Sequence, residues 1–325
     1  MNKVDISIVI CTHRRFDLLA GAVQSLVEQS ALPDSYEVIV VDNDHQPNPE
    51  VQEIVSKAIS KISIKYLHES KLGLSHARNA GGKLATSDYI GYMDDDAKAN
   101  PKYIEVLLKI LHEHVPDICG GPYYPFYLDP KPHWFRDIYG TGSHGDEARF
   151  LFGHEFLSGG NIILLKNLLE EIGWFHPKLG MKGRKLGYGE ETMVQIKARS
   201  THPGLKIYYD PELYVLHLVP AYKMSIWYEI RRAYQTEKYQ VYFWMPETKH
   251  RATHTRVFLS LAKTLLDLSV NIFFGIVFRD RLQYLYWQNY VYEKSFKYFS
   301  ALGGQMRLAA DFFKEHFSFR LSGNE

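Results

Sequence analysis

The sequence has few cysteines and almost no net charge, and both absences exclude classes of protein. Cys11 and Cys119 are the two cysteines in 325 residues, and each lies in an apolar run. We therefore expect no disulfide scaffold and no cysteine metal site, and a reducing cytoplasm is the simplest location. Lys and Arg total 38 against 37 Asp and Glu, a formal charge of +1. Because no overall basic field is present, we expect no nucleic-acid partner.

Glycine is absent from the loop after the first apolar run, and long runs without charge are also lacking. This loop, residues 12–15, reads THRR, whereas a nicotinamide dinucleotide site requires closely spaced glycines there. The longest apolar stretch, Val257 to Phe278, contains Lys263, Asp267 and Asn271. A central charge costs roughly 2.5 to 3.5 kcal/mol in a membrane span, so spanning is disfavoured for this stretch.

Apolar runs of strand length alternate with helical periods through the first hundred residues. The N-terminal run contains Asp5 and is too short for a signal peptide, so we interpret it as the first strand. The alternation is typical of βαβ units on a mostly parallel sheet flanked by helices, a Rossmann-like α/β fold. The predicted strands are Ile6 to Cys11, Tyr36 to Val41, Ile62 to Leu67, Tyr89 to Met93, Ile118 to Gly120, Ile162 to Leu165, Leu205 to Tyr209 and Tyr214 to Leu218. The predicted helices of this part run from Phe16 to near the Pro33 breaker, with apolar positions through Val27, and then over Val51 to Ile59, Leu74 to Leu84, Pro101 to about His114 and Glu190 toward Ala198.

Three consecutive aspartates follow the fourth predicted strand. Asp94, Asp95 and Asp96 repel one another and are poor strand formers. We therefore expect them just past the carboxyl end of the strand, where open α/β sheets bind ligands. A divalent cation together with a nucleotide diphosphate is the partner that suits these oxygen atoms. The alternative is an acidic turn that is simply solvated.

Five short motifs occur in an order that makes them informative together, although each alone is weak. CTHRR follows the first predicted strand, VVDND follows the second, GLSHARNAG precedes the fourth, DDD follows it, and GYGEE precedes a late helix. With this set the chain resembles glycosyltransferase family 2 over roughly its first two-thirds. The resemblance implies a GT-A catalytic domain at residues 1–220, with a nucleotide-sugar half at 1–121 and an acceptor half at 122–220.

The resemblance also implies which residues bind the donor. Thr12, Arg15 and Asp42 would hold the nucleotide, since a carboxylate accepts from a base N–H and an arginine meets a phosphate with two parallel donors. Arg78, in an A-R-N triplet, would reach the nucleotide or its phosphates. The alternatives are an ordinary turn residue for Asp42 and a solvated helix face for Arg78.

The metal ligands follow from the family's D-x-D pattern, which falls on Asp94 and Asp96. Asp96 is then the main metal ligand, with Asp94 beside it, while Asp94 or Asp95 accepts from the ribose hydroxyls. In this interpretation His217 completes the coordination of Mn²⁺ or Mg²⁺, and a core or surface histidine is the alternative. The cation would stabilise the charge that develops on the departing diphosphate.

The acceptor hydroxyl needs a base, and the resemblance places it at the Glu190-Glu191 pair. In the family this pair is Glu-Asp, and its second residue takes the proton, so Glu191 is the expected base. The glutamate in place of aspartate leaves the choice between Glu190 and Glu191 open. The alternative is two acids that complement a helix dipole. Gly160 and Asn161, in the SGGN turn at 158–161, are expected to bring the backbone close to the sugar or acceptor.

Beyond residue 220 the sequence predicts aromatic-rich helices, at Ile226 to Trp244, Val257 to Phe278, Leu282 to Phe299 and Met306 to Phe317. Three uses of the 221–325 region stay open. It covers the first domain, forms a homodimer seam, or makes peripheral contact with the inner face of the cytoplasmic membrane. Arginines at positions 251, 256, 279 and 281 flank the second of these helices and favour the membrane surface.

The combined prediction is an inverting glycosyltransferase of the hexosyltransferase class. It would move a sugar from a nucleotide-diphosphate sugar, with a UDP-sugar favoured, to a hydroxyl of a glycan or polyprenyl-linked acceptor. The reaction would be a metal-assisted single displacement in cell-surface polysaccharide or glycoconjugate synthesis. A sugar nucleotidyltransferase and a catalytically inactive membrane-surface scaffold of the same fold are the alternatives.

Overall fold

The computed structural model describes residues 4–183, 187, 189–244 and 254–321, with the side chains of 237–256 and 311–321 left out. The chain divides into two compact units. Unit 1 comprises Met1–Phe126 and Asp137–Leu218, and unit 2 comprises Tyr127–Arg136 and Val219–Glu325. The arginine position 251 lies outside the described residues, and so does the side chain at 256. Each unit is therefore described by itself.

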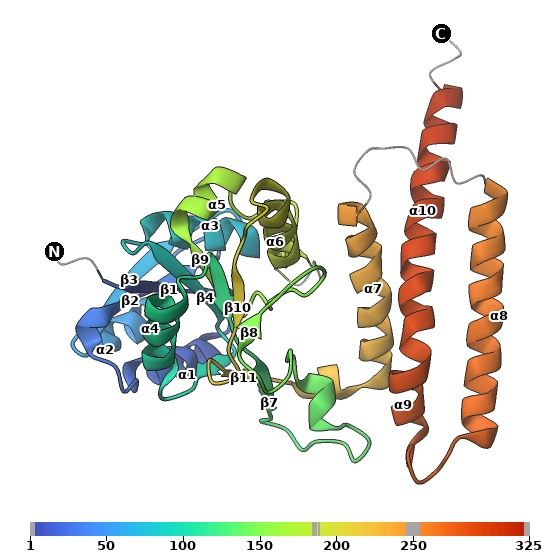
Figure 1. Cartoon of the computed structure of the whole chain (residues 1–325), viewed down its shortest axis with the longest axis horizontal. Coiled ribbons are helices and arrows are strands. Elements are labelled where there is room, and N and C mark those ends of the chain that lie inside the picture. The colour runs from blue at the N-terminus through green and yellow to red at the C-terminus, as the bar shows by residue number, and fades with distance from the viewer. Residues whose placement is uncertain (1–3, 184–186, 188, 245–253, 322–325) are drawn as a thin grey trace. The chain divides into compact units, whose positions relative to one another are not determined.

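Unit 1 is built on an eight-stranded sheet with the order β3-β2-β1-β4-β9-β6-β10-β8 (Figure 1). The first four strands in this order are parallel, β9 runs antiparallel between β4 and β6, β10 is parallel to β6, and β8 is antiparallel to β10. The predicted Rossmann-like α/β architecture is confirmed. The strands are β1 Ile6–Thr12, β2 Tyr36–Asp42, β3 Ser63–His68, β4 Tyr89–Asp94, β6 Ile118–Gly120, β8 Arg149–Phe150, β9 Asn161–Leu165 and β10 Ile207–Tyr209.

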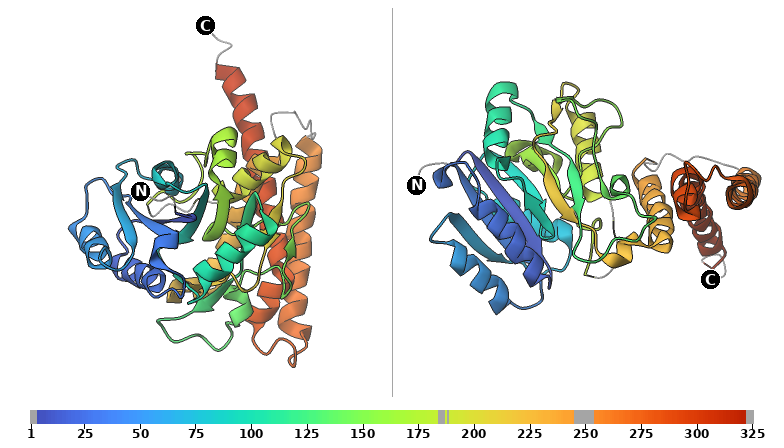
Figure 2. Two further views of the ribbon diagram at one scale, coloured as in Figure 1. Left: turned by 60° about the vertical axis from the view of Figure 1, so that its left-hand side comes forward. Right: turned by 90° about the horizontal axis from the view of Figure 1, so that it is seen from below.

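Helices cover both faces of this sheet, as the two views of Figure 2 show. Ile6, Ile8 and Ile10 of β1 point to one face, where α1, α2 and α4 pack, whereas Val9 points to the other face, where α3, α5 and α6 pack. Successive side chains of a strand alternate between faces, so a continuous apolar run is what a doubly covered strand requires. The helices are α1 Phe16–Val27, α2 Pro49–Ala58, α3 Leu74–Leu84, α4 Tyr103–His114, α5 Lys166–Ile172 and α6 Glu190–Thr201.

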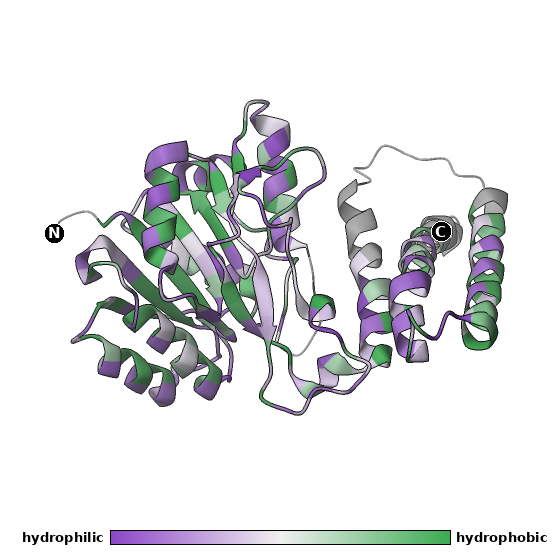
Figure 3. Ribbon diagram, turned by 60° about the horizontal axis from the view of Figure 1, so that its bottom comes forward, coloured by the Kyte–Doolittle hydropathy of each residue, from purple (hydrophilic) through white to green (hydrophobic). Residues whose placement is uncertain are grey.

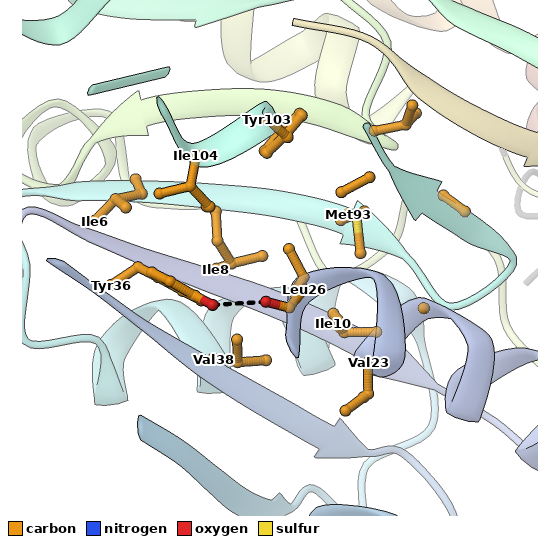
Figure 4. Packing of buried hydrophobic residues seen from close by; sticks show 14 of the residues in the cluster. Ile6, Ile8, Ile10, Val23, Leu26, Tyr36, Val38, Met93, Tyr103 and Ile104 are labelled. Atoms are coloured by element: carbon orange, nitrogen blue, oxygen red, sulfur yellow. Dashed lines mark hydrogen bonds between the residues drawn. The ribbon is translucent and has the colours of Figure 1, made fainter. Parts of the chain in front are cut away.

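The core on the α1 side is closed by one buried hydrogen bond. Tyr36 is 1% exposed, and its hydroxyl donates to the Leu26 carbonyl at 2.6 Å (Figure 4). A buried tyrosine hydroxyl needs such a partner, because burial without one is costly. The bond fixes the carboxyl end of α1 against the amino end of β2, and the opposite ends of these elements carry the polar residues described below.

A second sheet of three strands, in the order β5-β11-β7, extends unit 1 next to the aspartate triplet. Its strands are β5 Ala97–Ala99, β7 Tyr123–Phe126 and β11 Val215–Leu218. His217 of β11 pairs in register with Ala97, the residue directly after the triplet. This pairing brings together residues that are more than one hundred positions apart in the sequence.

The helices of unit 2 are α7 Ile226–Trp244, α8 His254–Phe278, α9 Trp287–Tyr290 and α10 Phe296–Leu321, with a π-helix at Val291–Ser295 and a short 3₁₀ helix at Ala221–Met224. Helix α10 packs against both α7 and α8. Two predicted boundaries are wrong. The helix expected from Leu282 starts at Trp287, because Asp280 holds a turn by accepting from the backbone N–H groups of Leu282 and Gln283.

The expected break between Phe299 and Met306 does not exist, since α10 continues through Gly303. The prediction treated this region as the end of a helix. A Cβ atom on Gly303 would lie 2.0 Å from the Tyr234 carbonyl oxygen of α7. The glycine therefore permits close approach of two helices, which is the other common reason for glycine inside a helix.

Candidate active site

The candidate site lies where β1 and β4 end side by side. Cys11 pairs in register with Asp94, so the loop after β1 and the aspartate triplet leave the sheet together. Thr12, the last residue of β1, donates from Oγ1 to Oδ2 of Asp95 at 2.7 Å. Both residues are buried. The triplet is therefore not a solvated turn, because one of its carboxylates is held inside the protein by the first βα loop.

Arg15 binds two of the three aspartates. Its Nη1 donates to Oδ2 of Asp96 at 2.6 Å, and its Nε and Nη2 donate to the two carboxylate oxygens of Asp95. Although burial opposes its charge, these carboxylates raise the pKa of Arg15. Burial, opposed by Arg15 and Thr12, raises the pKa of Asp95 to about 7. The residue predicted to meet a phosphate thus also neutralises the triplet.

Asp94, Asp96 and His217 form a candidate metal site. One ligand atom of each lies within 4.8 Å of the others. His217 Nε2 is 3.3 Å from Oδ1 of Asp96 and 3.8 Å from Oδ2 of Asp94. A Cβ on Gly160 would lie 2.5 Å from Oδ2 of Asp94, so only glycine leaves room for this carboxylate. Two carboxylates and an imidazole suit a divalent cation of the Mn²⁺ or Mg²⁺ kind.

Arg78 of α3 connects the two acidic clusters. Its side chain is 3% exposed; Nη1 donates to Oε1 of Glu190 at 2.9 Å, and Nη2 donates to the Gly159 carbonyl at 2.8 Å and to Oδ1 of Asp94 at 3.3 Å. Although burial opposes its charge, Glu190 and Asp94 raise the pKa of Arg78. The alternative of a solvated helix face is therefore wrong. One guanidinium touches both clusters, so they belong to a single site.

The two glutamates differ in their surroundings. Gly189 precedes α6 with a φ of 89°, a backbone conformation that favours glycine, and this turn places both glutamates in the first helical turn. Glu190 is buried and bound by Arg78. Glu191 is only partly buried. Burial first, and then the neighbouring Glu190, raise the pKa of Glu191. A carboxyl group with a raised pKa is a better proton acceptor than an ordinary one.

The side chains of two other predicted residues are occupied by the protein. Asn161 is fully buried; Tyr103 Oη donates to its Oδ1 at 2.7 Å, and its Nδ2 donates to the carbonyls of Pro122 and Leu213. The side chain of Asn161 therefore holds neighbouring segments together and is not available for a substrate. Asp42 accepts at one oxygen, Oδ2, from the Asn48 N–H at 2.7 Å and from the Tyr66 hydroxyl at 2.9 Å. This contact orders the loop before α2.

Two further polar residues hold the site loops in place, and the sequence did not indicate them. Gln195 is fully buried, and its amide exchanges hydrogen bonds of 2.9 Å with both the N–H and the carbonyl of Leu157, next to the SGGN turn. The sequence feature that could have indicated Gln195 is its position four residues after Glu191, because residues at this spacing lie on the same face of a helix. Asn43 accepts from the Gly73 N–H at 2.8 Å, which fixes the start of α3 and so the position of Arg78.

The chain is similar in sequence to known proteins. The model of the family described as glycosyl transferase family 2 matches residues 7–173, just over half of the chain. A glucosyl-dolichyl phosphate glucuronosyltransferase of Haloferax volcanii is 28% identical over 244 residues, which cover 71% of this chain and 74% of that protein. Some relatives are longer, and the chain spans 32% of a chondroitin synthase of Escherichia coli, to which it is 26% identical over 56% of its own length.

Solved structures show the same fold. The mannosyltransferase PcManGT from Pyrobaculum calidifontis, in complex with GDP-Man and Mn²⁺, superposes with a TM-score of 0.58 at 15% identity, covering 95% of this chain and 87% of that one. Residues 1–349 of TarS from S. aureus, in complex with UDP, give a TM-score of 0.51 at 15% identity, covering 94% and 92%. The predicted GT-A architecture is therefore confirmed.

Proposed function

The chain belongs to glycosyl transferase family 2 and is a glycosyltransferase, and from this premise we propose that it is an inverting, metal-dependent enzyme. The donor is a nucleotide-diphosphate sugar, and the acceptor is a hydroxyl of a glycan or lipid-linked glycan. The observation that carries the proposal is the contact of the Arg78 guanidinium with both Glu190 and Asp94. It supports a single site, because one guanidinium joins Asp94 of the candidate metal site to Glu190, the neighbour of the proposed base Glu191.

On the donor side, Asp94, Asp96 and His217 would hold Mn²⁺ or Mg²⁺, which supplies positive charge against the leaving diphosphate when bound. Oδ2 of Asp96 accepts from Arg15, so its other oxygen, Oδ1, is the one that faces His217. Arg15 is 46% exposed and has donors in a fork suited to phosphate. It therefore both positions Asp96 and presents charge to the nucleotide.

On the acceptor side, Glu191 is the base in this proposal. Arg78 donates to Oε1 of Glu190, so the side chain of Glu190 is already engaged within the protein. Glu191 has no arginine of its own among the described residues, is partly exposed, and has a raised pKa. One base and a single displacement imply inversion at the anomeric carbon. Gly159 and Gly160 keep the backbone beside Glu191 and Asp94 free of side chains.

The acceptor and donor classes follow the relatives. The Haloferax volcanii protein is named for a glucosyl-dolichyl phosphate substrate. By analogy with this relative, we propose that the present chain uses a polyprenyl-linked acceptor at the inner face of the cytoplasmic membrane. The two solved structures hold GDP-Man and UDP, and a UDP-sugar remains our favoured donor. The nucleotide-sugar half is assigned to residues 1–121 and the acceptor half to 122–220, with the 221–325 region outside the reaction.

The test compares three variants by donor turnover in the presence of Mn²⁺. Glu191→Gln should lower kcat by about 10²- to 10⁴-fold, the usual contribution of a general base, while donor binding stays unchanged. Asp96→Asn should lose both Mn²⁺ binding and transfer. Glu53→Gln, on the exposed face of α2, serves as the control. Full transfer by Glu191→Gln, or a product with retained anomeric configuration, would contradict the proposal. Pyrophosphate release from a nucleoside triphosphate would instead indicate a nucleotidyltransferase.

A further inference from the structure

Helix α8 carries apolar side chains on its solvent-exposed face. In the described part of the chain, Val257–Phe278 is the one helical stretch long and apolar enough to cross a membrane, with a mean hydropathy of 1.7, and 11% of its most apolar window is buried. Figure 3 shows hydrophobic residues along this helix. The exposed residues that define the α8 apolar face are 50% to 70% exposed: Phe258, Leu259, Leu266, Phe273, Phe274 and Val277. A patch of this kind marks an interaction site.

Several polar side chains of α8 point the other way, toward α10 and the π-helix before it, whereas Lys263 and Ser269 are exposed. Gln305 of α10 donates to Oγ of Ser260 and to Oγ1 of Thr264, both at 2.9 Å. Asn271 accepts from Ser295 at 2.7 Å. A helix on the surface of a water-soluble bundle has the opposite arrangement, with apolar residues inside and polar residues outside. In contact with lipid, polar groups are instead satisfied between helices.

We propose that the α8 apolar face docks onto a lipid bilayer, with the helix lying in the plane of the membrane surface. An interfacial helix buries its apolar face about 5 to 10 Å deep at the boundary of headgroups and acyl chains. The proposal goes beyond sugar transfer and does not depend on it, because it concerns only where unit 2 binds.

The neighbouring residues of α8 fit an anionic membrane surface. Arg279 and Arg281 follow its last turn, and Arg281 is exposed. Leu282 is 98% exposed and Leu285 is 64% exposed, and Trp287 lies shortly after them. Basic residues next to exposed leucines and a tryptophan are typical of segments at the headgroup level. A second copy of the chain would need an apolar partner surface, but it would not need this basic and aromatic end.

The contacts with α10 favour an in-plane helix over a spanning one. The Gln305 hydrogen bonds hold α10 beside α8, and the Ser295–Asn271 bond holds the π-helix that precedes α10. Helix α10 carries Lys297 and Arg307, so a spanning α8 would take these charges into the hydrocarbon region. On the membrane surface, α10 stays on the aqueous side while the opposite face of α8 meets the lipid.

Flotation of the full-length protein with vesicles tests the proposal. Vesicles of phosphatidylcholine with phosphatidylglycerol should carry the native chain to the top of the gradient, and phosphatidylcholine alone should carry less. The double variant Leu266→Glu/Phe273→Glu should lose at least tenfold in bound fraction. The matched control Leu32→Glu/Ile59→Glu, which alters two equally exposed apolar residues of unit 1, should float like the native chain. Unchanged circular dichroism spectra would show that all the variants are folded.

Two outcomes would overturn membrane docking. One is equal flotation of the native chain and the α8 double variant. The other is a native chain that does not bind vesicles but sediments as a dimer, while the α8 variant sediments as a monomer; the face would then be a dimer interface.

Spin labels at Leu259→Cys, Leu266→Cys and Val277→Cys determine the orientation of the helix in the membrane. Equal immersion depths support the in-plane helix, whereas depths that differ by up to about 27 Å, at 1.5 Å per residue, would show a spanning one.

Discussion

The site of unit 1 and helix α8 of unit 2 place polar and apolar groups in opposite ways. Around the site, the buried charged side chains of Arg78, Asp95 and Asp96 each have an opposite charge beside them. Arg78 lies beside Glu190 and Asp94, and Arg15 binds both Asp95 and Asp96. On α8, the side chains of Ser260, Thr264 and Asn271 are also bonded inside the protein, but most of the side chains on the outer face are apolar. In both regions these polar groups are satisfied internally. The difference is that the charges of unit 1 serve the proposed chemistry, whereas α8 exposes mostly apolar side chains to water.

The largest effect should come from breaking the charge network of unit 1. Arg78→Met leaves Glu190 and Asp94 without their shared cation, and removing one partner of a buried pair typically costs about 3 to 5 kcal/mol. Urea unfolding measures this loss, and transfer should disappear with it. Arg14→Met is the control, because this arginine is 65% exposed in its pair with Asp44 and should matter little. Similar losses for the two variants would show that Arg78 has no special structural role.

The second effect concerns the close packing in unit 2. Gly303→Val places a Cβ 2.0 Å from a backbone oxygen of α7, which cannot move like the end of a side chain. We expect a loss of about 2 to 3 kcal/mol, in the upper part of the usual range for overpacking. Gly204→Ala, whose added Cβ would meet nothing within 4 Å, should be neutral or slightly stabilising. A thermal midpoint for Gly303→Val equal to that of the native chain would mean that α7 and α10 do not pack this closely.

A smaller effect tests the inward polar side chains of α8. Asn271→Ala removes the acceptor of the fully buried Ser295 hydroxyl and should cost about 1 to 2 kcal/mol in urea unfolding. Ser269→Ala is a matched control on the same helix, because that hydroxyl bonds only to the Leu265 carbonyl one turn earlier. We expect it to change stability by a few tenths of a kcal/mol at most. If the two variants behave alike, the inward bonds of α8 do not stabilise unit 2.

The smallest expected effect is a shift in pH dependence. Glu191 must be deprotonated to accept a proton, and its raised pKa means that activity falls as pH drops through that higher value. Glu190→Gln removes the neighbouring negative charge and should lower the pKa of Glu191. The acid limb of kcat/KM should therefore move to lower pH, whatever happens to the maximal rate. Glu53→Gln should leave the limb in place, and a shift to higher pH in Glu190→Gln would argue against Glu191 as the base.

The spacing of apolar residues predicted most helices and strands of unit 1. Helix α1 was predicted to begin at Phe16, as the structure has it, and to end near Pro33, whereas it ends at Val27. The aspartate triplet was predicted just past the end of the fourth strand, and Asp94 is the last residue of β4. Both follow from side-chain periodicity within one element, which a sequence contains directly. In unit 2 the same approach failed at Gly303, because glycine permits either a helix end or a close helix contact, and the sequence does not distinguish them.

The spacing of apolar residues could not predict which charged side chains, far apart in the sequence, contact each other in the folded protein. Arg78 and Glu190 are 112 positions apart, and their contact depends on α3 and α6 packing on the same face of the sheet. The bonds from Tyr66 to Asp42 and from Asn161 to the Leu213 carbonyl also join residues that are far apart in the sequence. Such contacts result from the strand order, in which β9 lies between β4 and β6.

The sequence by itself determined the succession of strands and helices, the acidic residues at the ends of β4 and the start of α6, and the resemblance to the family. Only the tertiary structure decided which cation neutralises which carboxylate, and that the apolar face of α8 stays outside. The physical reason is that periodicity records whether a residue is buried, whereas its partner depends on which elements pack together.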